Sequence, residues 1–138
     1  MQDERISESL GHALVRAFRR VNRAHNRALK PLGLTAEQAH VLMVLWSEGR
    51  LKIGDLQRTL MLSSGTLTGA VDRMEEAGLV KRVPDPADGR AFFVEPVHVD
   101  ARRRKKIEQT LEATEEEAFG PLDQKDRKAL LKLLDKIP

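Results

Sequence analysis

The sequence contains no cysteine, which excludes disulfide bonds, thiolate metal sites and thiol-based redox sensing. It also contains no apolar run that approaches the roughly 20 residues of a transmembrane helix. The N-terminal residues lack the short apolar core of a secretory signal peptide. We therefore expect a soluble, cytoplasmic protein that does not enter a membrane.

The composition is that of a globular chain with a large solvated surface. Of the 138 residues, 41% are hydrophobic, which is enough for a core, and 33% are charged. This length fits one domain, or one domain with extensions. The formal net charge is only +3, so binding to nucleic acid must be argued from where the basic residues lie rather than from their sum.

Residues capable of catalysis or metal binding are present but are not arranged for it. The four histidines are scattered along the chain: His12, His25, His40 and His98. None forms an i, i+3 or i, i+4 pair with another histidine or with a carboxylate cluster. Three carboxylates lie near one another at the hairpin, whose tip contains Pro and Gly and cannot exclude water: Asp85, Asp88 and Glu95. We expect no enzyme activity, no metal and no cofactor.

The stretch from Leu51 to Val97 predicts two short helices and a β-hairpin. The first helix spans Ile53–Leu60, and the second begins at Ser63. The buried face of the second follows helical spacing: Leu67, Ala70, Val71, Met74 and Ala77. Its outer face opens with small or hydroxyl-bearing residues: Ser64, Gly65, Thr66, Thr68 and Gly69. Such residues are poor choices for a merely solvated helix, but they suit a helix end that enters a DNA major groove.

The hairpin follows this helix at once. Gly78 is the expected C-terminal stop of the helix. Leu79–Val83 then predicts a strand, Asp85–Arg90 a turn, and Ala91–Glu95 a second strand. A helix-turn-helix followed by a hairpin with an arginine at its tip is the arrangement of a winged helix.

Long helices flank this region. The first is expected over Ile6–Lys30, where Pro31 and Gly33 end it. One side carries a broad apolar stripe, and the other faces carry basic residues: Arg16, Arg19, Arg20, Arg23, Arg27 and Lys30. These cations form either an ordinary solvated face or a surface that draws DNA toward the protein. A capping box from Thr35 to Gln38 starts the next helix, whose Trp46 we expect to pack in the core.

Two further helices are predicted after the hairpin. The helix over Asp100–Phe119 is basic at its start and acidic at its end, which opposes the helix dipole. Either pairing of Arg104 with Glu108 or contact of the basic turns with DNA phosphates would account for this polarity. The last helix, Asp123–Ile137, is rich in leucine and too apolar to lie free in water, so we expect it to form a dimer interface with the first helix.

Several short motifs in this order resemble the MarR family of winged-helix transcription regulators. They begin at Leu34–Leu42, continue through Asp55-Leu56, Leu62–Thr68 and Val71–Glu75, and close on Gly78–Arg82 and Asp85–Ala91. The resemblance implies a homodimer on a pseudo-palindromic double-stranded DNA operator. It also implies that the helix from Ser63 reads the major groove, that Arg90 enters the minor groove, and that Asp88 orients Arg90 by a carboxylate–guanidinium pair. Many family members are repressors that a small aromatic or anionic ligand releases from DNA.

Three departures from the family pattern stand out. Gly89 occupies a position where a second basic wing residue is common, and Pro96-Val97 with Asp100 replace the usual residues after the second wing strand. The final helix is short, which predicts a smaller dimer interface.

The sequence therefore predicts a mainly α protein with a small β-hairpin wing. A winged helix-turn-helix domain (35–99) lies between an N-terminal dimerisation helix (1–34) and C-terminal helices that complete the dimerisation region (100–138). The predicted DNA-binding residues are Ser63, Ser64, Gly65, Thr66, Thr68, Arg73, Lys81, Arg82, Asp88 and Arg90. The candidate ligand-binding residues are His12, Arg16, Arg19 and Trp46. The alternative is a winged-helix dimer without an effector, which binds DNA non-specifically or binds a protein partner.

Overall fold

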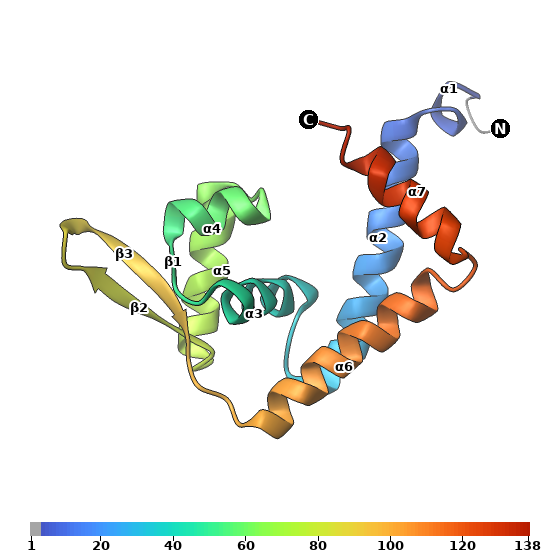
Figure 1. Cartoon of the computed structure of the whole chain (residues 1–138). Coiled ribbons are helices and arrows are strands. Elements are labelled where there is room, and N and C mark those ends of the chain that lie inside the picture. The colour runs from blue at the N-terminus through green and yellow to red at the C-terminus, as the bar shows by residue number, and fades with distance from the viewer. Residues whose placement is uncertain (1–3) are drawn as a thin grey trace. The chain divides into compact units, whose positions relative to one another are not determined.

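The computed structural model of the protein describes residues 4–138 and divides into two compact units (Figure 1). One unit spans Leu34–Lys105, and the other combines the residues up to Gly33 with those from Lys106 onward. Both are built mainly from helices, and the only sheet in the described part of the chain is the small one of the first unit. The predicted fold class, mainly α with a wing, is confirmed.

The unit Leu34–Lys105 is a winged helix-turn-helix. Its elements are α3 (Ala36–Glu48), β1 (Leu51–Lys52), α4 (Ile53–Leu60), α5 (Ser64–Glu76), β2 (Val80–Asp85) and β3 (Asp88–Pro96). Its core consists of apolar side chains that are almost completely buried: Leu42, Leu45, Leu56, Leu67, Val71, Met74 and Val94. Four of the five apolar residues predicted for α5 are buried, but Ala77 is exposed because α5 has ended and Ala77 is its C-cap. Gly78 follows with a φ of 73°, a left-handed conformation that favours glycine.

The start of α3 confirms the predicted capping box. The Thr35 side chain accepts a hydrogen bond from the Gln38 main-chain N–H, and Gln38 Oε1 accepts one from the Thr35 N–H. The prediction for Trp46 needs correction, because its side chain is only half-buried and the guanidinium of Arg104 lies 4.9 Å from the centre of its ring. Trp46 is thus held partly by a cation–π contact at the edge of the core.

The sheet has one strand more than the predicted hairpin. Its order is β1-β3-β2, with Leu51 paired to Val94 and Lys52 to Phe93 in antiparallel register. The predicted turn Asp85–Arg90 is also too long, because β2 continues to Asp85 and β3 begins at Asp88. Figure 1 shows β2 and β3 as a hairpin that extends beyond the helices of this unit.

The predicted helix Ile6–Lys30 is interrupted near its start. The structure has α1 (Glu4–Ser7), α2 (Leu10–Leu29) and a 3₁₀ turn, η1 (Lys30–Leu32). Ser9 separates α1 from α2 because its side chain accepts a hydrogen bond from the main-chain N–H of His12 at 3.2 Å, which makes it the N-cap of α2. The continuous apolar stripe hid this capping residue in the sequence.

The last two helices, α6 (Ala101–Ala118) and α7 (Gln124–Leu134), agree with prediction within a few residues. Arg127 links them: its guanidinium donates to the main-chain oxygens of Phe119 and Leu122 and to Oε1 of Glu116 at 2.7 Å. The Phe119 oxygen also accepts a hydrogen bond from the main-chain N–H of Leu122 at 2.9 Å, within the turn between the two helices. This arginine therefore fixes the turn that aims α7.

Candidate nucleic-acid interface

The beginning of α5 is held by hydrogen bonds between hydroxyl residues. Ser63 is the N-cap: its Oγ accepts from the main-chain N–H of Thr66 at 3.2 Å and donates to Thr66 Oγ1 at 2.8 Å. The hydroxyls of Ser64 and Thr68 are exposed and form no hydrogen bond within residues 4–138. The first two turns of α5 thus present hydroxyl groups at a rigid helix end.

Glycines leave the outer face of α5 unusually bare. A Cβ added at Gly65 would meet no atom within 4 Å, so the fold itself does not require glycine there. Glycine destabilises a helix interior by about 1 kcal/mol relative to alanine. A glycine at position 65 therefore suits a close approach by another surface. A Cβ at Gly69 would lie 3.3 Å from a guanidinium nitrogen of Arg73. Arg73 therefore folds back across Gly69 toward the start of α5.

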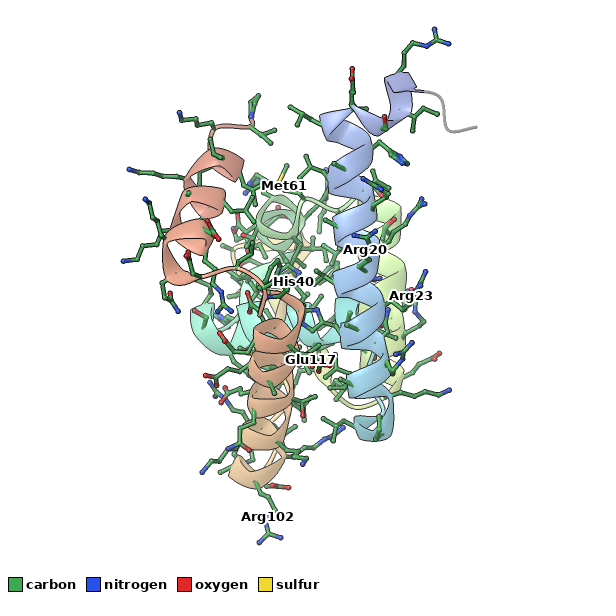
Figure 2. All side chains as sticks on the ribbon, turned by 90° about the vertical axis from the view of Figure 1, so that its right-hand side faces the viewer. Arg20, Arg23, His40, Met61, Arg102 and Glu117 are labelled. Atoms are coloured by element: carbon green, nitrogen blue, oxygen red, sulfur yellow. The ribbon has the colours of Figure 1, made fainter. Side chains whose placement is uncertain are left out.

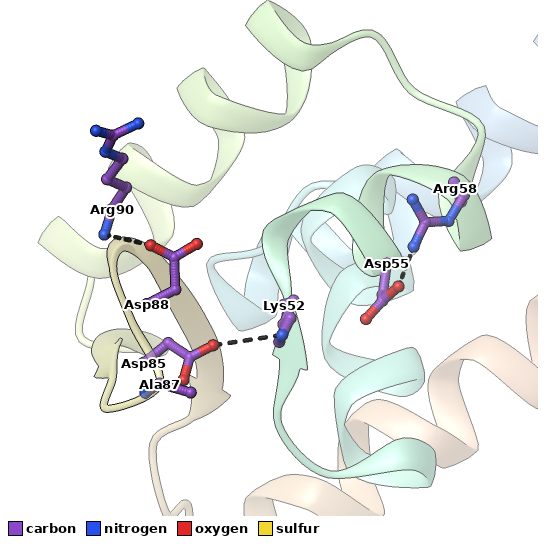
Figure 3. A network of polar contacts seen from close by, with 7 residues as sticks. All are labelled: Lys52, Asp55, Arg58, Asp85, Ala87, Asp88 and Arg90. Atoms are coloured by element: carbon purple, nitrogen blue, oxygen red, sulfur yellow. Dashed lines mark hydrogen bonds and ion pairs between the residues drawn. The ribbon is translucent and has the colours of Figure 1, made fainter.

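The turn end of the wing is fixed by a buried carboxylate. Asp85, only 5% exposed, pairs with Lys52 of β1 at 3.3 Å and accepts a hydrogen bond from the Ala87 main-chain N–H at 2.9 Å (Figure 3). The Ala87 hydrogen bond and the Lys52 charge together lower the pKa of Asp85 below its ordinary value, against the opposing effect of burial. The ion pair connects the two outer strands of the sheet and holds the turn at Pro86-Ala87.

The predicted pairing of Asp88 with the Arg90 guanidinium is wrong. Asp88 Oδ1 instead accepts a hydrogen bond from the main-chain N–H of Arg90 at 3.0 Å, and the Arg90 side chain points away from the carboxylate (Figure 3). An Asp side chain that bonds the main chain two residues on is an Asx turn. Asp88 thus shapes the tip of the wing, and within residues 4–138 the guanidinium of Arg90 has no partner.

Arg82 occupies a different position from the other predicted DNA-binding arginines. Its side chain is 25% exposed and crosses from β2 to α5, where it pairs with Asp72 at 2.5 Å and Glu75 at 2.8 Å. Glu75 also accepts a hydrogen bond from the Arg82 main-chain N–H at 3.0 Å. Partial burial alone would lower the pKa of Arg82, but the hydrogen bonds and charges of the two carboxylates outweigh it and raise the pKa.

This Asp72–Glu75–Arg82 cluster was missed in the sequence, and it ties the wing to α5. By contrast, Lys81 is 60% exposed and reaches only Glu95, at 3.6 Å. A pair so exposed contributes little to stability, so Lys81 remains available to a phosphate.

We expect Arg82→Ala to lower the free energy of unfolding by roughly 1–2 kcal/mol without DNA present, because the two partly exposed carboxylates lose their shared partner. Denaturant unfolding monitored by circular dichroism measures this. Asp72→Ala should lower the free energy of unfolding less in the Arg82→Ala variant than in wild type, because the Asp72–Arg82 pair is already lost. A change in unfolding within about 0.5 kcal/mol, the range of ordinary surface substitutions, together with a weaker salt dependence of DNA binding, would make Arg82 a phosphate contact instead.

The candidate ligand residues belong to both units. His12, Arg16 and Arg19 are exposed on α2, whereas Trp46 belongs to the winged unit. A cavity of about 520 Å³ lies in the other unit, and its walls come from α2 and α6. Its lining is largely small and apolar, with charged groups at the edges: Ala17, Arg20, Val21, Ala24, Arg27, Ala28, Thr114, Glu117, Ala118 and Phe119.

Two other features are absent from residues 4–138. No group of three or more histidine, aspartate or glutamate side chains is placed to hold a metal ion. None of the helices in this range has both the length and the apolar character that crossing a membrane requires.

Comparison with known proteins identifies the family. The family model described as MarR family matches residues 34–92. The transcriptional regulator MgrA of Staphylococcus aureus is 30% identical over 133 residues, which cover 96% of this chain and 89% of MgrA.

Solved structures agree along nearly the whole chain. A mutant MarR from E. coli, complexed with operator DNA, has a TM-score of 0.81 at 27% identity and covers 94% of both chains. BpsR of Bordetella bronchiseptica, whose DNA binding is regulated by 6-hydroxynicotinic acid, has a TM-score of 0.81 at 28% identity and covers 95% of this chain and 94% of BpsR. With its sequence and its fold in agreement, this chain belongs to the MarR family of winged-helix transcription regulators.

Proposed function

We propose that the protein is a sequence-specific DNA-binding regulator in which α5 reads the major groove and the wing enters the minor groove. The observation that carries this proposal is the exposed start of α5, where Ser64 and Thr68 have free hydroxyls and Gly65 has open space above it. Hydroxyl groups can bond to base edges or phosphates, and small residues permit close approach. A non-specific binder would need lysine and arginine at this end instead.

The remaining predicted contacts divide by their partners. Arg90 and Lys81 have guanidinium or ammonium groups that the fold uses little or not at all. Arg73 lies along the outer face of α5. Ser63, Arg82 and Asp88 are engaged in holding α5 and the wing. We assign these three a positioning role and the first three, with Ser64, Thr66 and Thr68, the contacts to DNA.

The active form is proposed to be a homodimer that binds a pseudo-palindromic operator. Large apolar side chains are exposed on α2 and from α7 onward: Leu10, Phe18, Leu131, Leu133 and Ile137 are 83%, 66%, 64%, 59% and 56% exposed. Exposed apolar side chains gathered on the helices of one unit mark an interaction surface. Two-fold symmetry would then place two copies of α5 on two half-sites.

Release by a small aromatic or anionic ligand is the proposed mode of regulation, with the protein acting as a repressor. The similarity to BpsR, whose DNA binding a hydroxynicotinic acid regulates, supports this proposal. The cavity between α2 and α6 has a volume in the range of small-molecule sites. Its alanine-rich walls and the nearby Arg20 and Arg27 suit an amphipathic anion better than the exposed His12 and Arg16 do.

Selection of bound sequences from random duplex DNA at physiological salt tests the function. We expect an enriched palindrome whose half-sites lie about one helical turn apart. On that operator, Thr66→Ala and Ser64→Ala should relax base preference, whereas Lys81→Ala should weaken binding to all sequences about equally. Alanine is the better replacement for Lys81, because a glutamate there would repel the neighbouring Glu95.

Three results would contradict the proposal or its assignment of contacts. Binding without enrichment would support the non-specific alternative, and absence of binding would indicate a protein partner. A change of base preference in Lys81→Ala, with none in Thr66→Ala or Ser64→Ala, would reverse the assignment of the contacts.

A further inference from the structure

We infer that the basic face of α2 is a second, sequence-independent binding surface for the phosphate backbone of DNA. This face is defined by six exposed residues: Arg16, Arg19, Arg20, Arg23, Arg27 and Lys30. It lies in a different unit from α5 and the wing. The inference rests on the proposed function for its choice of DNA as the partner, but it concerns a surface that the helix-turn-helix does not contain.

Helical geometry places all six cations together. An α-helix turns by about 100° per residue, so these positions fall within an arc of roughly 100° around the α2 axis. From Arg16 to Lys30 the face is about 21 Å long at 1.5 Å per residue. Arg20 and Arg23 can be followed on neighbouring turns of α2 in Figure 2. At 3.4 Å per phosphate along one strand, a face of this length matches about six phosphates.

The charges on this face are not balanced within the chain. From Leu10 to Leu29, α2 contains no aspartate or glutamate. Among residues 4–138, none of the six cations forms an ion pair. Like charges spaced three and four residues apart destabilise a helix, and Arg16, Arg20 and Arg23 have that spacing. Stability of α2 therefore does not explain why the cations are gathered there.

Four of the six cations do not line the cavity and are free for an outside partner: Arg16, Arg19, Arg23 and Lys30. The exposed apolar residues Leu10, Leu14 and Phe18 lie on the opposite side of α2 by the same helical geometry. A dimer that buries the apolar side leaves the basic side exposed. Five of the six cations are arginine, whose planar guanidinium bonds phosphate oxygens in pairs. These features are explained better by a face that binds a phosphate backbone than by a face that contacts only solvent.

The test is the salt dependence of binding by the triple variant Arg16→Gln/Arg19→Gln/Arg23→Gln. Arg20 and Arg27 stay unchanged because they line the cavity. Glutamine is a good helix former and removes the like-charge repulsion, so α2 should remain folded. We expect the slope of log K against log salt to become less steep by about 2–3 for each engaged protomer, and affinity near physiological salt to fall at least tenfold. The loss should be the same for the selected operator and for a scrambled duplex.

The matched control is Lys125→Gln/Lys128→Gln/Lys132→Gln, which removes three exposed charges from α7 in the same unit. Sedimentation checks that both variants keep the wild-type oligomeric state. An unchanged slope in the α2 variant, or an equal change in the control, would overturn the inference. So would loss of labelled polyglutamate binding with an unchanged DNA slope, which would assign the face to an acidic protein. Equal wild-type affinity for both duplexes would instead refute sequence-specific recognition, and a reduced slope would still support the α2 contact.

Discussion

Replacement of Arg90 by alanine should weaken binding to the selected operator by roughly 10- to 100-fold, equivalent to about 1.4–2.7 kcal/mol. Arg90 lies just beyond the turn of the wing, and its guanidinium has no partner within residues 4–138. A narrow minor groove concentrates negative potential and attracts such an arginine. Because the fold makes no use of this side chain, its loss should leave the free energy of unfolding within about 0.5 kcal/mol of wild type. Fluorescence anisotropy on the operator measures the change.

Two controls separate the groove contact from the shape of the wing. Asp88→Asn keeps the side-chain oxygen that accepts from the Arg90 main-chain N–H, so it should bind at least as tightly as wild type. If Asp88 acted by pairing with the guanidinium, that variant would lose affinity instead. Lys125→Ala removes one exposed charge from α7 and should have no effect. Operator binding by Arg90→Ala within twofold of wild type would refute the role given to the wing.

The helices of the winged unit could be predicted because their ends are encoded locally. Thr35 and Gln38 form a capping box that spans only four residues, and Ser63 caps α5 by the same kind of short-range bond. The α4 bounds, Ile53–Leu60, also agree with the prediction, although Lys52 provides no side-chain cap. Signals of this kind depend on neighbours in the sequence, so they can be read without knowledge of tertiary structure.

Features that depend on pairing at a distance could not be predicted. The strand Leu51–Lys52 is too short for a periodic pattern, and only its pairing with Val94 and Phe93 defines it. Asp72, Glu75 and Arg82 meet because the chain reverses at Gly78 and brings β2 back along α5. Helical spacing says nothing about such a helix–strand contact, so the sequence predicts Arg82 as a DNA contact and gives no sign of its two carboxylate partners.

The wing tip is a case where the sequence held a usable signal. Asp88-Gly89-Arg90 has the spacing of an Asx turn, in which an aspartate side chain accepts from the main chain two residues on. The guanidinium pair came from the family resemblance instead. The Asx turn forms instead of the guanidinium pair, because the main-chain N–H two residues on lies close to the Asp88 carboxylate. The guanidinium of Arg90 stands at the end of a long side chain that can turn away.

The second large effect concerns the dimer. The double variant Phe18→Glu/Leu133→Glu should be monomeric at concentrations where wild type is dimeric. These side chains are 66% and 59% exposed on α2 and α7. Burying one large apolar side chain stabilises an interface by about 1.5–3 kcal/mol, and the double variant removes both side chains from each protomer. Association should therefore weaken by at least roughly 10⁴-fold, before the cost of burying the new charges is added. Sedimentation velocity measures the oligomeric state, and truncation before Asp123, which removes α7, should have the same result.

Met61→Glu is the matched control for this change. Met61 is also an exposed apolar residue, at 85%, but it lies in the turn between α4 and α5 of the winged unit (Figure 2). If general surface apolarity drove association, Met61→Glu would dissociate the dimer as effectively as the double variant does. If the interface consists of α2 and α7, Met61→Glu should remain dimeric. The double variant should also bind the operator far more weakly than wild type does, because a monomer presents only one α5 to a palindrome. If the chain truncated before Asp123 stays dimeric but the double variant does not, the interface lies on α2. If the truncated chain and the double variant both stay dimeric, the proposed dimer surface is refuted.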